Sequence, residues 1–146
     1  FEDWVDACLV ELEGLAVNVP LEAMSTAWLA SLRGRDPYLD LAPLLFTALE
    51  RNSSFEGLVA FKGLAMRRLF EIAQSVVRVY PSLSIPDAFT FLNLGFAATT
   101  SYWAVSTENP PLKKIYQMDE FKVLKPNFES DLANGLEIIL KGLGIS

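Results

Sequence analysis

The sequence predicts an all-α fold in a single domain that spans residues 1–146. Apolar residues recur at helical spacing along most of the chain, and no run alternates between apolar and polar residues as a half-buried strand would. Prolines, glycines and helix-capping residues separate these periodic runs. The hydrophobic content of 51% in 146 residues is enough for one buried core. We therefore expect a bundle of about six helices.

The first half of the chain divides into three expected helices, at residues 1–13, 20–32 and 36–51. Gly14 follows the first helix, as glycine often does at a helix end. Pro43 lies inside the third helix and should kink it or separate its first turn, because proline has no N–H to donate.

The second half divides into helices at residues 55–80, 85–107 and 128–143, with a loop-rich segment from 108 to 126 that could hold one short helix. N-cap signals precede all three long helices: Ser53 with Glu56, Ser84 with Asp87, and Asn127.

Residue composition excludes most catalytic and metal sites. Histidine is absent and Cys8 is the only cysteine, which excludes a Ser-His-Asp triad, a Cys-His pair and a His- or Cys-based zinc site. An enzyme would work through carboxylates, the only acid-base groups present in number, and these lie mostly on polar helix faces. We therefore expect no enzyme activity, no metal and no cofactor. A lone cysteine without a disulfide partner favours a reducing, cytoplasmic compartment, with Cys8 as a small buried apolar residue rather than a sensor thiol.

Charge and hydropathy bear on nucleic acid and membrane binding. The net charge is −6, and the first 32 residues carry six acids and no base, so the chain should not bind nucleic acid by itself. Residues 88–107 are uncharged and long enough to cross a bilayer. Seven of the twenty are Asn, Ser or Thr, so we interpret this stretch as a helix buried by protein and expect no membrane partner.

Several residues are candidates for a pocket for a small apolar ligand. Lys62 lies in the middle of the apolar face of the 55–80 helix, where its ammonium could meet an anionic ligand, pair with an acid such as Glu50, or reach solvent. One stripe of the 85–107 helix alternates aromatic and polar residues, which is typical both of ligand pockets and of hydrogen-bonded cores. The expected ligand-binding residues are Trp28, Phe46, Lys62, Met66, Asn93, Phe96, Thr100 and Trp103.

Two helices carry candidates for a homodimer interface. The 85–107 helix has a stripe of mostly small residues, and the 128–143 helix gathers its apolar residues within about 100° of arc. The last helix could seal the core of one chain, or the two helices could form a four-helix interface with a second copy. The expected interface residues are Gly95, Thr99, Tyr102, Phe128, Leu132, Leu136 and Ile139.

The order of elements resembles one known family. The run LLFTALERNSSFEGLVAFKGLAMRRL, a long buried helix, a proline-rich loop and NFESDLANGLEIILKGL are similar to the C-terminal half of TetR-family transcriptional regulators. The resemblance covers nearly the whole chain and is most specific at ERNSS and GLEIILKGL. It implies a ligand-binding and dimerisation domain that dimerises through its last two long helices.

The resemblance also implies a function. We expect the effector half of a bacterial transcriptional regulator, a repressor released by a small apolar ligand, such as a fatty acid or an aromatic acid if Lys62 meets an anion. Operator DNA would be a partner only through an N-terminal helix-turn-helix, which these residues do not contain and which we expect upstream of Phe1. The alternative is a stand-alone carrier or sensor of a small apolar molecule without a DNA-binding head.

Overall fold

The structure, a computed structural model, describes residues 1–44, 47–48 and 50–146. Six helices in the described part have nine residues or more: α1 (Glu2–Glu13), α2 (Leu21–Leu32), α3 (Asp36–Leu44), α5 (Phe55–Val79), α6 (Ile85–Ser106) and α8 (Phe128–Gly142). The shorter ones are α4 (Glu50–Asn52), α7 (Pro110–Ile115) and the 3-10 turn η2 (Lys122–Leu124). The described residues form no strand, so the expected all-α fold is confirmed.

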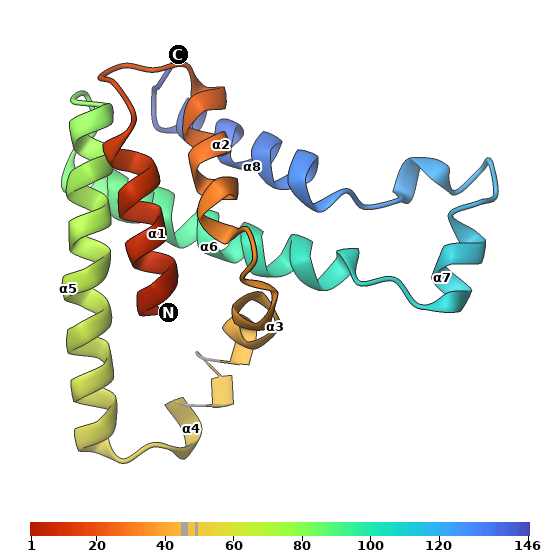
Figure 1. Cartoon of the computed structure of the whole chain (residues 1–146), viewed down its shortest axis with the longest axis horizontal. Helices are drawn as coiled ribbons and strands as arrows, with labels where there is room; N and C mark the ends of the chain where they lie inside the picture. The colour runs from red at the N-terminus through yellow and green to blue at the C-terminus, as the bar shows by residue number, and fades with distance from the viewer. Residues whose placement is uncertain (45–46, 49) are drawn as a thin grey trace.

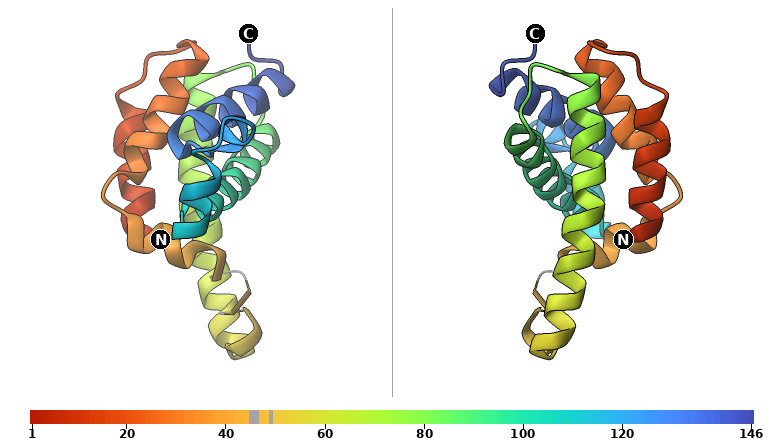
Figure 2. Two further views of the ribbon diagram at one scale, coloured as in Figure 1. Left: turned by 90° about the vertical axis from the view of Figure 1, so that its right-hand side faces the viewer. Right: turned by 90° about the vertical axis from the view of Figure 1, so that its left-hand side faces the viewer.

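The helices pack around α6, which contacts α3, α5 and α8. In Figure 1 α5 lies along one edge of the molecule, and it contacts both α1 and α6. Figure 2 shows α1 and α2 side by side on one side and α6 and α8 together on the other, and α2 also contacts α8 directly. The N-terminal half of α5 extends past the rest of the bundle together with α4 (Figure 2). The segment that holds α7 and η2 projects from the C-terminal end of α6, far from α5 (Figure 1).

Aromatic rings fill the centre of the core. The Trp28 ring packs edge-on against Trp4 at 5.7 Å and against Phe91 at 5.5 Å, measured between ring centroids. Both indole nitrogens are satisfied across helix boundaries: Nε1 of Trp4 donates to Oγ of Ser31 at 3.1 Å, and Nε1 of Trp28 donates to Oγ1 of Thr99 at 3.0 Å. The core therefore specifies how α1, α2 and α6 meet through hydrogen bonds as well as through apolar burial.

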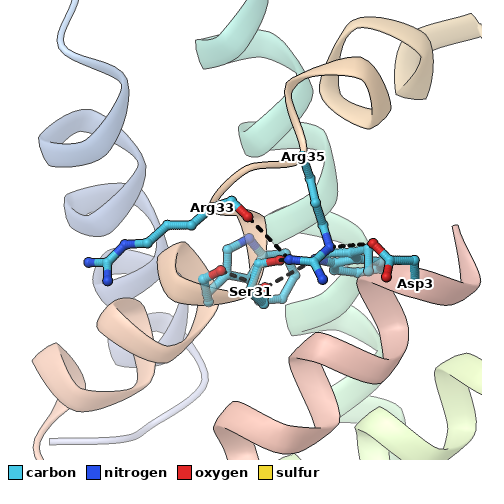
Figure 3. A network of polar contacts seen from close by, with 6 residues as sticks. Asp3, Ser31, Arg33 and Arg35 are labelled. Atoms are coloured by element: carbon cyan, nitrogen blue, oxygen red, sulfur yellow. Dashed lines mark hydrogen bonds and ion pairs between the residues drawn. The ribbon is translucent and has the colours of Figure 1, made fainter.

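Arg35 connects α1 to the end of α2 (Figure 3). Its Nε donates to a carboxylate oxygen of Asp3 at 2.7 Å, and a second guanidinium nitrogen donates to the main-chain carbonyls of Ser31 and Arg33. The Ser31 carbonyl belongs to the last turn of α2 and the Arg33 carbonyl follows it, so the guanidinium supplies donors at this helix end.

The helix boundaries follow most of the sequence signals. Ser84 and Asp87 form the predicted capping box of α6, and the Asn127 side chain caps α8. The cap of α5 is Ser54, whose Oγ accepts from the main-chain N–H of Gly57, so the prediction of Ser53 with Glu56 was wrong by one residue. The two serines are adjacent, and the sequence alone does not decide which hydroxyl reaches the first turn.

The uncharged residues 88–107 lie in α6, against α5 and α8, apart from Thr107 just beyond its end. None of the helices in the described part of the chain is long and apolar enough to cross a membrane.

Candidate ligand site and dimer surface

A cavity of about 100 Å³ opens where α1, α5 and α6 meet. The lining residues are Phe1, Trp4, Leu69, Leu92, Asn93 and Phe96. Three of them are aromatic and two are leucines, so the Asn93 amide is the polar side chain of the lining. We call this space the inner cavity. An apolar wall with a single amide can orient a mainly apolar ligand by one pair of hydrogen bonds.

Trp4, which lines the inner cavity, is held by contacts with α2 and α3. Its ring stacks on Tyr38 of α3 at 5.8 Å, and its indole nitrogen is held by Ser31. The Tyr38 hydroxyl is buried without a hydrogen-bond partner among the described residues, and burial raises the pKa of Tyr38 above its ordinary range. Burial also raises the pKa of Cys8 to about 12, so this thiol is neutral and unreactive.

A second, more open cavity of about 380 Å³ lies at the projecting end of α5. Its lining residues are Glu50, Phe55, Leu58, Val59 and Lys62. The Lys62 ammonium forms an ion pair with the Glu50 carboxylate, and the Lys62 side chain is 54% exposed. We call this space the outer cavity. It places one cation and one carboxylate beside an apolar wall.

The two cavities share one face of α5. At 100° per residue, Leu58, Lys62 and Leu69 lie within about 40° of one another, and we call them the inner strip. Lys62 and Leu69 are seven residues apart, which is about 10 Å along a helix. The inner strip therefore contributes to both cavities, with Leu58 and Lys62 in the outer one and Leu69 in the inner one.

The predicted ligand-binding residues divide between several places. Asn93 and Phe96 line the inner cavity, and Lys62 lines the outer cavity. Met66 is 65% exposed on α5. Trp28 is buried in the core behind Trp4.

Thr100 and Trp103, like Met66 and Trp28, line neither cavity. The Thr100 hydroxyl donates to the main-chain carbonyl of Ala97 in its own helix. Trp103 donates to the Asp40 carboxylate at 2.8 Å and lines a separate hollow beside α8. Phe46 lies outside the described residues.

Sequence reasoning missed Phe1, Trp4, Leu69 and Leu92. Phe1 and Trp4 are spaced by three residues, which places them on one face of α1, but they stand in an acidic segment that resembles a solvent-facing helix. Only the packing of α1 against α5 shows that this face is turned inward.

Most of the predicted interface residues contact other parts of the same chain. Gly95, Thr99, Leu132 and Leu136 are buried in the core. A Cβ at Gly95 would lie 3.0 Å from side-chain atoms of both Trp28 and Leu136, so the small residue allows α2 and α8 to approach α6.

The other three predicted interface residues are partly buried. Tyr102 lies against Gly135 of α8, where an added Cβ would be 3.3 Å from the Tyr102 ring. Phe128 packs edge-on against Trp103 at 5.1 Å, and Ile139 packs against the core. A partner can reach these residues only in part, so an interface on α6 and α8 must use exposed neighbours.

The exposed face of α6 points away from this core. It carries Leu94, Ala97, Ser101 and Val105, which lie within about 80° of arc. Leu94 is 49% exposed and Val105 is 54% exposed, and on α8 Ile138 is 57% exposed. These positions form a mostly small and apolar surface without a partner among the described residues of the chain.

The family comparison agrees with this arrangement of helices. The family model described as "Tetracyclin repressor-like, C-terminal domain" matches residues 1–146. The chain belongs to this family. TetR-like C-terminal domains are regulatory domains that bind ligands and typically dimerise. No curated protein and no solved structure matches the chain. The described residues of this TetR-like domain contain no cluster of His, Cys, Asp or Glu that could hold a metal ion.

Proposed function

We propose that this domain is the effector-binding half of a TetR-like transcriptional regulator and that the inner cavity receives a small, mainly apolar ligand. The observation that carries this proposal is the wall of three aromatic rings and two leucines around the Asn93 amide. A preformed apolar hollow with one polar group is typical of small-molecule sites.

The ligand we propose has an anionic group that reaches Lys62. The inner cavity has room for a ring or a few methylenes, and the inner strip continues for about 10 Å to the ammonium of Lys62. A ligand carboxylate there would compete with Glu50 for the same ammonium. A medium-chain fatty acid or an aryl-substituted acid has this shape and charge.

The dimer we propose forms through α6 and α8. It uses the exposed strip Leu94, Ala97, Ser101 and Val105, with Ile138 on the neighbouring helix. An isologous interface places the same strip of both copies around one two-fold axis. Ligand binding at α1, α5 and α6 would favour one arrangement of the two copies, because α6 belongs to both the inner cavity and the dimer surface.

In the whole regulator, we propose that an N-terminal helix-turn-helix binds operator DNA and that the ligand releases it, so that the protein acts as a repressor. The domain itself supports only the effector and dimer roles, because its net charge of −6 disfavours phosphate contacts.

Calorimetric titration of the domain with decanoate and with decanol tests the ligand proposal. The acid should bind more tightly than the alcohol, and Lys62→Met should weaken decanoate about fivefold, the effect of a half-exposed charge pair. Decanol affinity should hardly change. Lys141→Met, at an exposed position on α8, is the matched control and should leave both affinities unchanged. Equal weakening of acid and alcohol, or binding of neither, would contradict the proposal.

A further inference from the structure

A separate hollow of about 210 Å³ lies where the turn between α2 and α3 meets the C-terminal part of α6 and the start of α8. We call it the side hollow. Five of its lining residues are apolar: Leu29, Leu32, Leu39, Trp103 and Phe128. It shares no lining residue with the inner cavity or the outer cavity. The side hollow is therefore a further place in the described chain where the apolar part of a small molecule fits.

Two aromatic rings give the side hollow a fixed wall. The Trp103 ring packs edge-on against Phe128 with 5.1 Å between ring centroids, and its Nε1 donates to the Asp40 carboxylate at 2.8 Å. The ring contact joins α6 to α8, and the hydrogen bond joins α6 to α3. The indole cannot turn into the hollow without breaking these contacts, so the apolar surface is preformed.

Three charged side chains also line the side hollow: Arg33, Asp36 and Glu129. All three residues are exposed, and none of them forms an ion pair with another residue in the described part of the chain. One guanidinium and two carboxylates therefore stand around the same apolar hollow without neutralising one another. Both kinds of charge are available to a ligand.

The turn after α2 fixes where Arg33 points. Its main-chain carbonyl accepts from the Arg35 guanidinium at 3.2 Å, and Arg35 is itself held by the Asp3 carboxylate. Gly34 follows with a φ of 70°, a conformation that favours glycine. Figure 3 shows the Arg33 side chain extending away from Arg35, on the side of the molecule where α8 lies. The Arg33 cation and the Glu129 anion thus line the hollow from different elements.

A ligand that satisfies all of these groups carries a carboxylate, an ammonium and an apolar side chain. The carboxylate would accept from the two parallel donors of Arg33, and the ammonium would donate to Glu129 or Asp36. A ligand with a single charge would be attracted by one kind of group and repelled by the other. We propose that the side hollow binds an α-amino acid with an apolar side chain, which packs against Trp103 and Phe128. This site is separate from the inner cavity and does not depend on the ligand proposed there.

NMR of the nitrogen-labelled indole N–H groups locates the site. The chain has three tryptophans, and Trp103→Phe identifies the signal of Trp103. L-Phenylalanine at millimolar concentration should shift this signal and leave those of Trp4 and Trp28 in place, because Trp103 is the tryptophan that lines the side hollow. Decanoate should instead shift the signal of Trp4, a wall of the inner cavity. Failure of decanoate alone would count against the proposed function. No shift with L-phenylalanine, or equal shifts of all three signals, would overturn the present inference.

Analogues that lack one charge test the recognition of both. Hydrocinnamate lacks the ammonium and phenethylamine lacks the carboxylate, and each should bind about fivefold more weakly than L-phenylalanine, the effect of one exposed charge pair. Arg33→Met should weaken L-phenylalanine by about the same factor and leave phenethylamine no weaker. Glu129→Gln combined with Asp36→Asn should weaken L-phenylalanine and leave hydrocinnamate no weaker.

Two substitutions on α5 are the matched controls. Arg67→Met and Glu56→Gln make the same chemical changes at exposed positions away from the side hollow and should not alter L-phenylalanine binding. Either analogue binding as tightly as L-phenylalanine would overturn the assignment of an amino acid, and so would equal weakening by the side-hollow variants and their controls.

Discussion

The indole nitrogen of Trp28 donates a 3.0 Å hydrogen bond to Oγ1 of Thr99, and both residues are almost completely buried. The same hydroxyl donates to the main-chain carbonyl of Gly95 at 2.8 Å, so one threonine serves as donor and acceptor between α2 and α6. Trp28 packs against Trp4, a wall of the inner cavity. The bond therefore links the wall of the inner cavity to α6, the helix of the proposed dimer surface.

Thr99→Val should destabilise the fold by about 1–3 kcal/mol, because valine keeps the volume but leaves the buried indole N–H without an acceptor. Urea unfolding followed by circular dichroism measures this loss. Thr100→Val is the matched control on the next residue, where the hydroxyl bonds only within its own helix, and should change stability by less than about 0.5 kcal/mol. Equal effects at both positions would show that the Trp28 bond contributes little.

Gly95→Ala should also destabilise the domain, although alanine is the better helix former. The added Cβ would meet Trp28 and Leu136 at 3.0 Å, and overpacking of this kind costs about 1–3 kcal/mol, more than the ~1 kcal/mol gained in helix propensity. Gly142→Ala at the end of α8 meets no atom within 4 Å and should be neutral or stabilising. Thermal unfolding of the two variants tests the difference, and a stabilised Gly95→Ala would contradict the close packing described above.

Helical periodicity and capping residues were enough to predict the helices, because these signals are local, whereas the family was predicted from the resemblance of ERNSS and GLEIILKGL. Which side of each helix packs against the core was harder to predict. Gly95 and Thr99 were expected on a dimer surface since their stripe is small, but small residues also allow close packing inside one chain. Within one chain Gly95 packs closely against Trp28 and Leu136, and Thr99 accepts a hydrogen bond from Trp28. Both partners are far from α6 in the sequence.

The lining of the inner cavity, too, could be predicted only in part from the sequence. Asn93 and Phe96 were found because polar and aromatic residues share one face of a long helix. Trp4 was missed because its segment is acidic, and its inward orientation depends on long-range contacts with Ser31 and Tyr38. A local sequence pattern does not indicate such long-range contacts.

Stability should fall as the pH rises above about 9. Burial raises the pKa of Cys8 from its ordinary value of 9.0 to about 12, so the folded protein keeps a proton that the unfolded chain releases. The contribution is fully present below pH 9 and is lost as the pH rises from 9 towards 12, with a slope of at most about 1.4 kcal/mol per pH unit for one group. Burial of Tyr38 acts in the same direction.

Urea unfolding of the wild type and Cys8→Ala at pH 8, 9, 10 and 10.5 checks this dependence. The variant loses some packing at every pH, so the slopes are compared rather than the absolute stabilities. Cys8→Ala should show the shallower decline. Parallel curves would mean that Cys8 does not hold its proton in the folded state.

The last prediction concerns the proposed dimer surface on α6. Leu94→Glu with Val105→Glu should convert the dimer into a 16.2 kDa monomer, because two carboxylates would be buried at an otherwise apolar seam. Both side chains are about half exposed in the single chain, so the fold should survive and circular dichroism should be unchanged. Leu132→Glu would be uninformative, since Leu132 has no exposed surface and its substitution would disrupt the core.

Val10→Glu with Val17→Glu makes the same change in charge at equally exposed positions near α1 and should leave the dimer intact. Light scattering at micromolar concentration distinguishes the species. A wild-type domain that is already monomeric, or a dimer that persists in the Leu94 and Val105 variant, would show that α6 does not carry the interface.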